Sequence, residues 1–95
     1  MWIRSQDKEE LVKCNSVSYT EEFCLNEGNY LVGLCDGLIR SIGQYSTKEK
    51  ALKVLDMIQN YFEINKKCIF QQHDDEWYCF NEDVFQMPQD DEVIV

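Results

Sequence analysis

The chain has 95 residues, of which 44% are hydrophobic, and its formal net charge at pH 7 is −9. This length fits a single domain covering residues 1–95, with enough apolar side chains to fold without a metal or a disulfide. The negative charge argues against direct binding to nucleic acid or to an anionic membrane, because both carry charge of the same sign.

The five cysteines are Cys14, Cys24, Cys35, Cys68 and Cys79, an odd number with no repeated spacing. The N-terminal residues contain no apolar run typical of a signal peptide. No stretch approaches the ~20 apolar residues that a membrane span needs. We therefore expect reduced thiols and a cytoplasmic protein.

The first part of the chain predicts an antiparallel β-meander. Apolar residues predict short strands at 2–4 and 11–14, separated by a polar turn. Alternation of apolar and polar residues predicts a half-buried strand over 17–25, with an irregularity at 21–22 where the alternation slips. The Asn- and Gly-containing stretch 26–29 predicts the next turn, because these residues adopt positive φ at low cost.

Two further strands complete the meander. Residues 30–35 form a compact apolar run, and Asp36 with Gly37 predicts a two-residue hairpin turn that needs positive φ at both positions. The return strand covers 38–45. Neither of its faces is cleanly polar, so we expect it to lie in the centre of the sheet, covered on both sides.

An amphipathic helix is predicted over about residues 47–63. Ser46 and Glu49 have the spacing of a capping box, in which each side chain accepts a hydrogen bond from the other residue's backbone N–H. Such a helix would lie across a sheet, because its apolar arc covers more than half of the circumference; the alternative is that one flank faces a partner. The arc comprises Ala51, Leu52, Val54, Leu55, Met57, Ile58, Tyr61 and Phe62.

The C-terminal residues 68–95, here named the acidic tail, hold most of the net charge. They contain eight carboxylates and no Lys or Arg, whereas residues 1–67 contain ten acidic and nine basic residues. The acidic tail therefore contributes −8 of the total −9. Aromatic side chains are interleaved with these acids.

The acidic tail is predicted to form a β-hairpin from strands at 68–70 and 77–80, followed by a short strand at 84–87. Residues 89–92 are expected to be solvated, and residues 93–95 either dock or fray. With the meander and the helix, these elements predict an α+β fold. It consists of an antiparallel β-meander, one amphipathic helix packed on the sheet, and a C-terminal acidic and aromatic β-hairpin.

Two interpretations of the acidic tail stay open. In one, the aromatic side chains face a core and the acids face water. In the other, the same residues form a surface for a basic partner, with Trp77 and Tyr78 as anchors at the centre of the contact. The residues predicted to contact that partner are Asp74, Asp75, Glu76, Trp77, Tyr78, Glu82, Asp83, Asp90, Asp91 and Glu92.

Patterns for metal binding or catalysis are weak. Cys68, His73 and Cys79 are spaced too widely for a typical structural zinc site and lack a fourth ligand. His73, the only histidine, lies beside three acids, which favours its charged form over a role as general base. Since there is also no phosphate-binding glycine loop and no nucleophile elbow, we expect no metal, no cofactor and no enzyme activity.

Residues 1–8 (MWIRSQDK) resemble the opening of a group of small proteins from Firmicutes and their phages and mobile elements. In that group a segment similar to 43–47 (GQYST) leads into a helix similar to 50–58 (KALKVLDMI), and 84–88 (VFQMP) is similar as well. The group has no assigned activity, so no site residue carries over. What the resemblance implies is a bacterial cytosol and a phage or mobile-element genome.

In that setting, small acidic proteins without enzymatic motifs resemble inhibitors of host defence nucleases, including anti-CRISPR proteins. A carboxylate array can occupy a Lys- and Arg-lined groove that normally holds nucleic acid. We therefore predict a binding protein of this kind, whose partner is the basic surface of a nucleic-acid-binding protein. Two alternatives stay open. One is a nucleotide sponge in which Arg4, Lys8 and Arg40 meet phosphate, and the other is an adaptor that dimerises through a helix flank or an open sheet edge.

Overall fold

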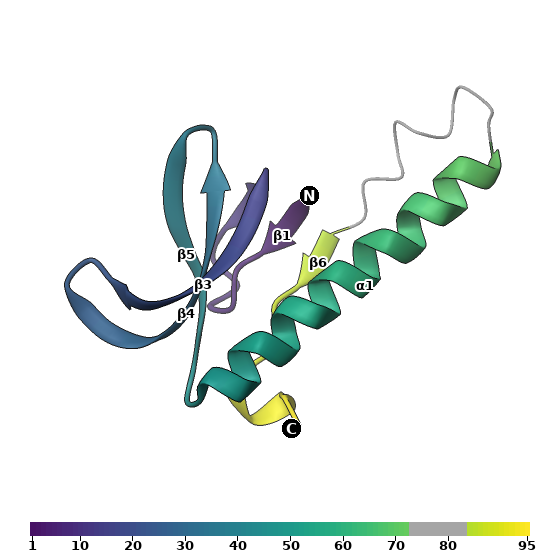
Figure 1. Cartoon of the computed structure of the whole chain (residues 1–95). Coiled ribbons are helices and arrows are strands. Elements are labelled where there is room, and N and C mark those ends of the chain that lie inside the picture. Colours follow the sequence, from purple (N-terminus) through teal and green to yellow (C-terminus); the bar gives the residue numbers. More distant parts are fainter. Residues whose placement is uncertain (73–83) are drawn as a thin grey trace.

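Two three-stranded sheets and one long helix make up the described part of the protein, which confirms the α+β class (Figure 1). The computed structural model describes residues 1–72 and 84–95, with side chains through residue 64 and again from residue 84. In chain order its elements are β1 (Trp2–Arg4), β2 (Leu11–Lys13), β3 (Ser16–Phe23), β4 (Asn26–Cys35), β5 (Leu38–Tyr45), α1 (Lys48–Gln72), β6 (Val84–Gln86) and the 3-10 turn η2 (Asp90–Glu92).

The two sheets differ in strand direction. Strands β3, β4 and β5 form an antiparallel meander in that order, whereas the strands at 2–4 and 11–14, which were predicted to begin the same meander, lie in the other sheet. The other sheet has the order β2-β1-β6, with β2 antiparallel and β6 parallel to β1. In Figure 1, β6 runs between β1 and α1. The two ends of the chain therefore meet in one sheet, a pairing that the sequence did not predict.

The hairpin turns are tight, and one lies elsewhere than predicted. Asp36 (φ 52°) and Gly37 (φ 83°) form the expected turn between β4 and β5. The turn between β3 and β4, however, is made by Cys24 (φ 52°) and Leu25 (φ 69°), not by residues 26–29. Those residues belong to β4, because the bulge at the predicted irregularity in β3 shifts the register and lets the ladder continue to the last residue of β3.

Strand β5 is an edge strand, not the predicted central one, because β4 lies between β3 and β5. A bulge opposite Leu31 and Val32 leaves Ile42 as an extra residue in β5. The extra residue breaks the expected alternation, so that Leu38 is 61% exposed whereas Ile42 is 2% exposed, although strict alternation would place both on one face. The strand therefore has no single polar or apolar face.

The helix begins one residue later than the predicted capping box implies. Thr47 is the cap, since its Oγ1 accepts a hydrogen bond from the backbone N–H of Lys50 at 3.1 Å. The backbone N–H of Ser46 donates instead to Asp90 Oδ1, at 2.8 Å. A contact with the C-terminal segment thus takes the place of the local cap that the sequence predicted.

The helix also continues beyond its predicted end. It extends to Gln72, so residues 68–70 are helical and not the first strand of a hairpin. No Gly or Pro occurs between residues 63 and 72 to stop it. The second predicted hairpin strand, residues 77–80, lies outside the described residues. The short strand predicted at 84–87 is present as β6.

The core lies where α1, both sheets and the C-terminal segment meet. Helix α1 packs on β3, β4 and β5, and Tyr61 Oη donates to the carbonyl of Val84 at 3.2 Å. Each large apolar side chain buried here stabilises the fold by ~1.5–3 kcal/mol. Val93 is buried, whereas Val95 is 71% exposed, so the end of the chain docks through one residue only. The most deeply buried side chains include Ile3, Leu31, Ile42, Val54 and Met87.

Within the described ranges, no helix has an apolar stretch long enough to reach across a lipid bilayer.

Candidate binding surfaces

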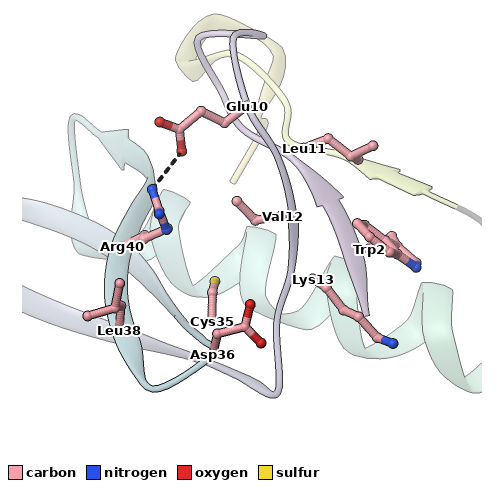
Figure 2. Close-up of a pocket in the computed structure, with 9 residues that line it drawn as sticks. All are labelled: Trp2, Glu10, Leu11, Val12, Lys13, Cys35, Asp36, Leu38 and Arg40. Atoms are coloured by element: carbon pink, nitrogen blue, oxygen red, sulfur yellow. Dashed lines mark ion pairs between the residues drawn. The ribbon is translucent and has the colours of Figure 1, made fainter.

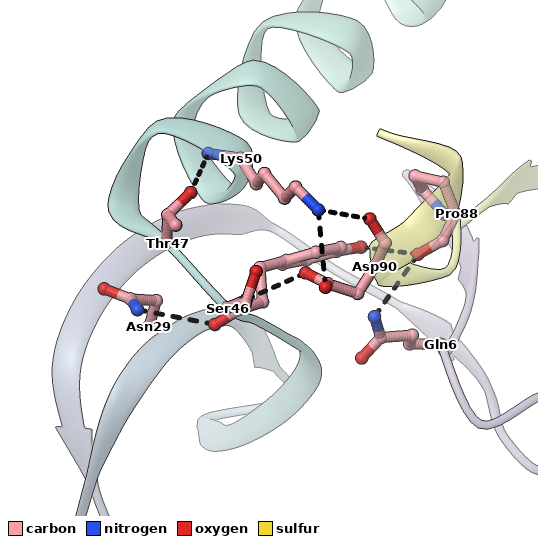
Figure 3. A network of polar contacts seen from close by, with 8 residues as sticks. Gln6, Asn29, Ser46, Thr47, Lys50, Pro88 and Asp90 are labelled. Carbon is pink, nitrogen blue, oxygen red and sulfur yellow. Dashed lines mark hydrogen bonds and ion pairs between the residues drawn. The ribbon is translucent and has the colours of Figure 1, made fainter. Parts of the chain in front are cut away.

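Asp90 is held by contacts within the protein. Besides the hydrogen bond from the Ser46 N–H, Asp90 accepts two from Lys50 Nζ. Its backbone carbonyl accepts at 3.0 Å and its Oδ2 at 3.4 Å (Figure 3). The pKa of the Asp90 carboxyl lies below its usual value, chiefly because the Ser46 N–H donates to it, with the Lys50 cation as a further cause. Asp90 therefore joins the start of α1 to the C-terminal turn.

The same turn is fixed by the side chains of Gln6 and Tyr45. Tyr45 Oη donates to the carbonyl of Pro88 at 2.8 Å, and burial raises the pKa of this hydroxyl. Gln6 Nε2 also reaches the Pro88 carbonyl, at 3.4 Å, while Gln6 Oε1 accepts from the backbone N–H of Gln44 at 2.8 Å. Gln89 Nε2 donates a hydrogen bond to the backbone carbonyl of Gln6 at 2.7 Å. The C-terminal segment is thus docked by hydrogen bonds from two distant parts of the chain.

The structure brings together only some of the predicted partner-contacting residues. Asp90, Asp91 and Glu92 lie in one turn, η2, where Asp91 and Glu92 are exposed. Glu92 Oε1 accepts a hydrogen bond from the backbone N–H of Gln89 at 2.7 Å. The others lie outside the described residues: Asp74, Asp75, Glu76, Trp77, Tyr78, Glu82 and Asp83.

A second acidic surface lies at the far end of the β3–β4 hairpin. It is formed by Glu21, Glu22, Glu27 and Leu25, here named the acidic hairpin tip, and Leu25 is 91% exposed. In Figure 1 this end of the hairpin projects away from α1. The signal for it was present in the sequence, since residues 14–39 contain four carboxylates and no Lys or Arg.

The acidic hairpin tip departs from what strand pairing alone favours. Glu22 pairs directly with Glu27 across the two strands, and like charges in such a pair are destabilising. Leu25 adopts positive φ, which non-glycine residues rarely do. In the part of the chain that the structure describes, the ion pairs found are Arg40 with Glu10 and Lys50 with Asp90, so none neutralises the tip.

An open pocket of about 470 Å³ lies between β2 and the β4–β5 turn (Figure 2). Its walls include Trp2, Lys13 and Arg40, and Arg40 forms an ion pair with Glu10 at 3.6 Å. Lys13 Nζ lies 5.8 Å from the centre of the Trp2 ring. Of the three cations predicted to meet a nucleotide phosphate, Arg40 alone is among the described lining residues, because Arg4 and Lys8 lie elsewhere on the fold.

A shallower apolar groove of about 450 Å³ runs along one flank of α1. Met1, Val17, Leu55 and Phe62 line it together with polar helix residues. Its residues Leu55, Ile58 and Phe62 belong to the predicted apolar arc, for which exposure of one unspecified flank to a partner was the alternative.

Among the described residues, no three His, Cys, Asp or Glu side chains are grouped so as to hold a metal ion. The sequence candidates His73 and Cys79 lie outside those residues. Comparisons with protein families, with curated proteins and with solved structures found no match for this chain.

Proposed function

We propose that this protein is a non-enzymatic binding protein that inhibits a nucleic-acid-handling protein by covering its basic groove with carboxylates. In a bacterial host such a target belongs to the defence nucleases. The observation that carries the proposal is the acidic hairpin tip, in which Glu22 and Glu27 face each other across the strands with no ion pair among the described residues.

Charge placement supports the proposal. A domain selected for stability alone gains by placing a Lys or Arg opposite a Glu, yet no cation occurs between Lys13 and Arg40. The acidic tail also has no cation over residues 68–95. A basic partner would neutralise both regions, and their shared sign would steer its approach over a Debye length of ~10 Å at moderate salt.

The acidic hairpin tip also carries an apolar anchor. Leu25 stands 91% exposed between the glutamates, and burying it in a partner would remove its side chain from water. Apolar contact at the centre of a charged rim is the usual arrangement of a protein interface. The tip therefore suits a basic groove that has an apolar floor.

The test begins with capture of partners from bacterial lysate on the immobilised protein, at low and at high salt, with identification by mass spectrometry. Each captured protein is then offered duplex DNA or RNA as a competitor. We expect retention of a nucleic-acid-binding protein at low salt only, and its release by the competitor, because both ligands use the same cationic groove.

Two variants with the same change in net charge separate the surface from general acidity. The first combines Glu21→Gln, Glu22→Gln and Glu27→Gln, which neutralises the acidic hairpin tip. The matched control neutralises exposed acids elsewhere, by Glu9→Gln, Asp56→Asn and Glu63→Gln. We expect the first to lose the partner and the control to keep it. Equal retention by both would refute the role of the tip.

The acidic tail is tested separately, by Asp74→Asn, Asp75→Asn and Glu76→Gln in one variant. If this variant loses the partner while the hairpin-tip variant keeps it, the contact lies in the tail. If no nucleic-acid-binding protein is retained at either salt concentration, inhibition through charge mimicry is wrong for this protein.

The pocket near Arg40 supports a second candidate, the binding of a small anionic ligand such as a nucleotide. Trp2 contributes an aromatic ring, and Lys13 and Arg40 line the pocket together with Glu10 and Asp36, so that an anionic ligand would compete with Glu10 for Arg40. Thermal unfolding in the presence of a nucleotide panel tests it, because a ligand that binds only the folded state raises the Tm. A stabilising nucleotide whose effect is lost in Arg40→Ala would favour this function over mimicry.

A further inference from the structure

Two cysteines from different sheets meet in the core. Cys14 follows β2, and Cys35 is the last residue of β4. Their Sγ atoms lie 3.3 Å apart, with Cys14 2% and Cys35 6% exposed. Cys24, by contrast, lies exposed at the β3–β4 turn. The pair therefore stands apart from the chain's other described thiol in both burial and proximity.

The surrounding backbone is built around this pair. The N–H of Cys14 donates to the carbonyl of Met1 at 2.7 Å, and the N–H of Asn15 donates to the carbonyl of Leu34 at 2.8 Å, which fixes the chain beside β4. Gly33 leaves space for the Cys14 sulfur, because a Cβ at that position would lie 2.6 Å from it. The backbone beside Cys14 is thus anchored with the two sulfurs already 3.3 Å apart.

We propose that Cys14 and Cys35 are a redox modification site, at which a low-molecular-weight disulfide converts the two thiols into a disulfide that links the two sheets. A thiol pair at van der Waals contact needs only a small closure to reach bonding distance. The bond would enclose β3 and most of β4, and with them the acidic hairpin tip.

The chemistry proceeds in two exchange steps. The Cys35 thiolate attacks one sulfur of the small disulfide, whose S–S bond breaks and releases one thiolate. The Cys14 sulfur then attacks the Cys35 sulfur of this mixed disulfide and releases the second thiolate. Both protein thiols are oxidised, the small disulfide is reduced to two thiols, and the two protons of the cysteines end on the two leaving groups.

Access decides the order of the two steps. Cys35 lines the open pocket near Arg40, so a small disulfide in that pocket meets its sulfur first. Burial and the contact with Cys35 raise the pKa of Cys14 to about 12, so its thiolate is scarce near neutral pH. Formation of the bond is therefore slow at neutral pH and accelerates as the pH rises.

The experiment uses the full reduced chain and hydroxyethyl disulfide, a small uncharged member of this class. After incubation, free thiols are alkylated under denaturing conditions and the protein is digested. Trypsin leaves Cys14, Cys24 and Cys35 in one peptide, because no Lys or Arg occurs between Lys13 and Arg40. A protease that cleaves after Glu separates all three, since Glu22 and Glu27 lie between them.

We expect a peptide pair linked through Cys14 and Cys35, removed by reduction, and a rise in Tm of ~15 °C from closing a loop of this length. Cys24→Ser is the control variant, and it should yield the same linked pair. The proposal is overturned if Cys14 and Cys35 are both recovered alkylated, or if either is recovered linked chiefly to Cys24. This readout needs no substitution in the core, so a variant that fails to fold does not affect it.

Discussion

Tyr45→Phe tests whether the docked C-terminal segment contributes to folding stability. The substitution removes the Tyr45 hydroxyl, which donates to the Pro88 carbonyl at 2.8 Å. Tyr45 as a whole is 3% exposed. Loss of such a bond costs about 1–3 kcal/mol when it leaves a buried acceptor unpaired. Pro88 keeps a second, longer bond from Gln6 Nε2 at 3.4 Å, so we expect the lower part of that range, about 1–2 kcal/mol.

Urea unfolding followed by circular dichroism measures this loss, which corresponds to a decrease in Tm of ~5–10 °C for a domain of this size. Tyr30→Phe is the matched control. Tyr30 is 9% exposed, and no hydrogen bond of its hydroxyl is found in the described structure. If Tyr45→Phe destabilises the protein no more than Tyr30→Phe, the segment 88–93 is not held as the structure places it.

Two further predictions concern the same framework. The pKa of Asp90 is lowered in the folded state. The contribution of its carboxylate to folding stability is therefore complete above the unfolded-state pKa of 3.8 and is lost as the pH falls through the folded-state pKa. The difference in Tm between the wild type and Asp90→Asn should therefore be present at pH 6 and shrink below pH ~3.8; a difference independent of pH would contradict the pairing. Gly33→Ala should reduce the free energy of unfolding by ~1–3 kcal/mol, because the new Cβ meets Cys14 Sγ at 2.6 Å. The double variant with Cys14→Ala should recover part of that loss in a double-mutant cycle, and strict additivity would argue against the contact.

Local patterns predicted the elements whose cause is local. The turn at Asp36 and Gly37 follows from residues that tolerate positive φ, and α1 follows from apolar residues at helical period. The slip in β3 was visible because alternation failed at two adjacent glutamates. In each case the information lies within a few residues of the element that it specifies.

The predictions were wrong where contacts between segments far apart in the chain determine the local structure. The predicted cap at Ser46 is replaced because Asp90, far along the chain, accepts that N–H. The predicted turn at 26–29 is wrong because pairing with β3 continues through those residues and leaves the turn to Cys24 and Leu25. Residues 68–70 have strand-like composition, yet they continue a helix that nothing before them stops.

The candidate binding surfaces likewise have some features that the sequence shows and others that only the structure shows. The acidity of residues 74–76 and 90–92 is a sequence property, and its role as a partner-binding surface stays a prediction. Only the structure shows that the Asp90 carboxylate is already engaged by Ser46 and Lys50. Only the structure also pairs Glu22 with Glu27, because register is a relation between strands and not a property of either one.

Composition and local pattern were enough to predict the α+β class, the amphipathic helix and the sign of the net charge. These follow from composition and from periodicities of two and 3.6 residues, which act over short range. Tertiary structure decided the parallel pairing of β6 with β1, the edge position of β5 and the meeting of Cys14 with Cys35. Each of these depends on closing a long loop, and the free energy that closes it comes from core packing between residues far apart in the chain.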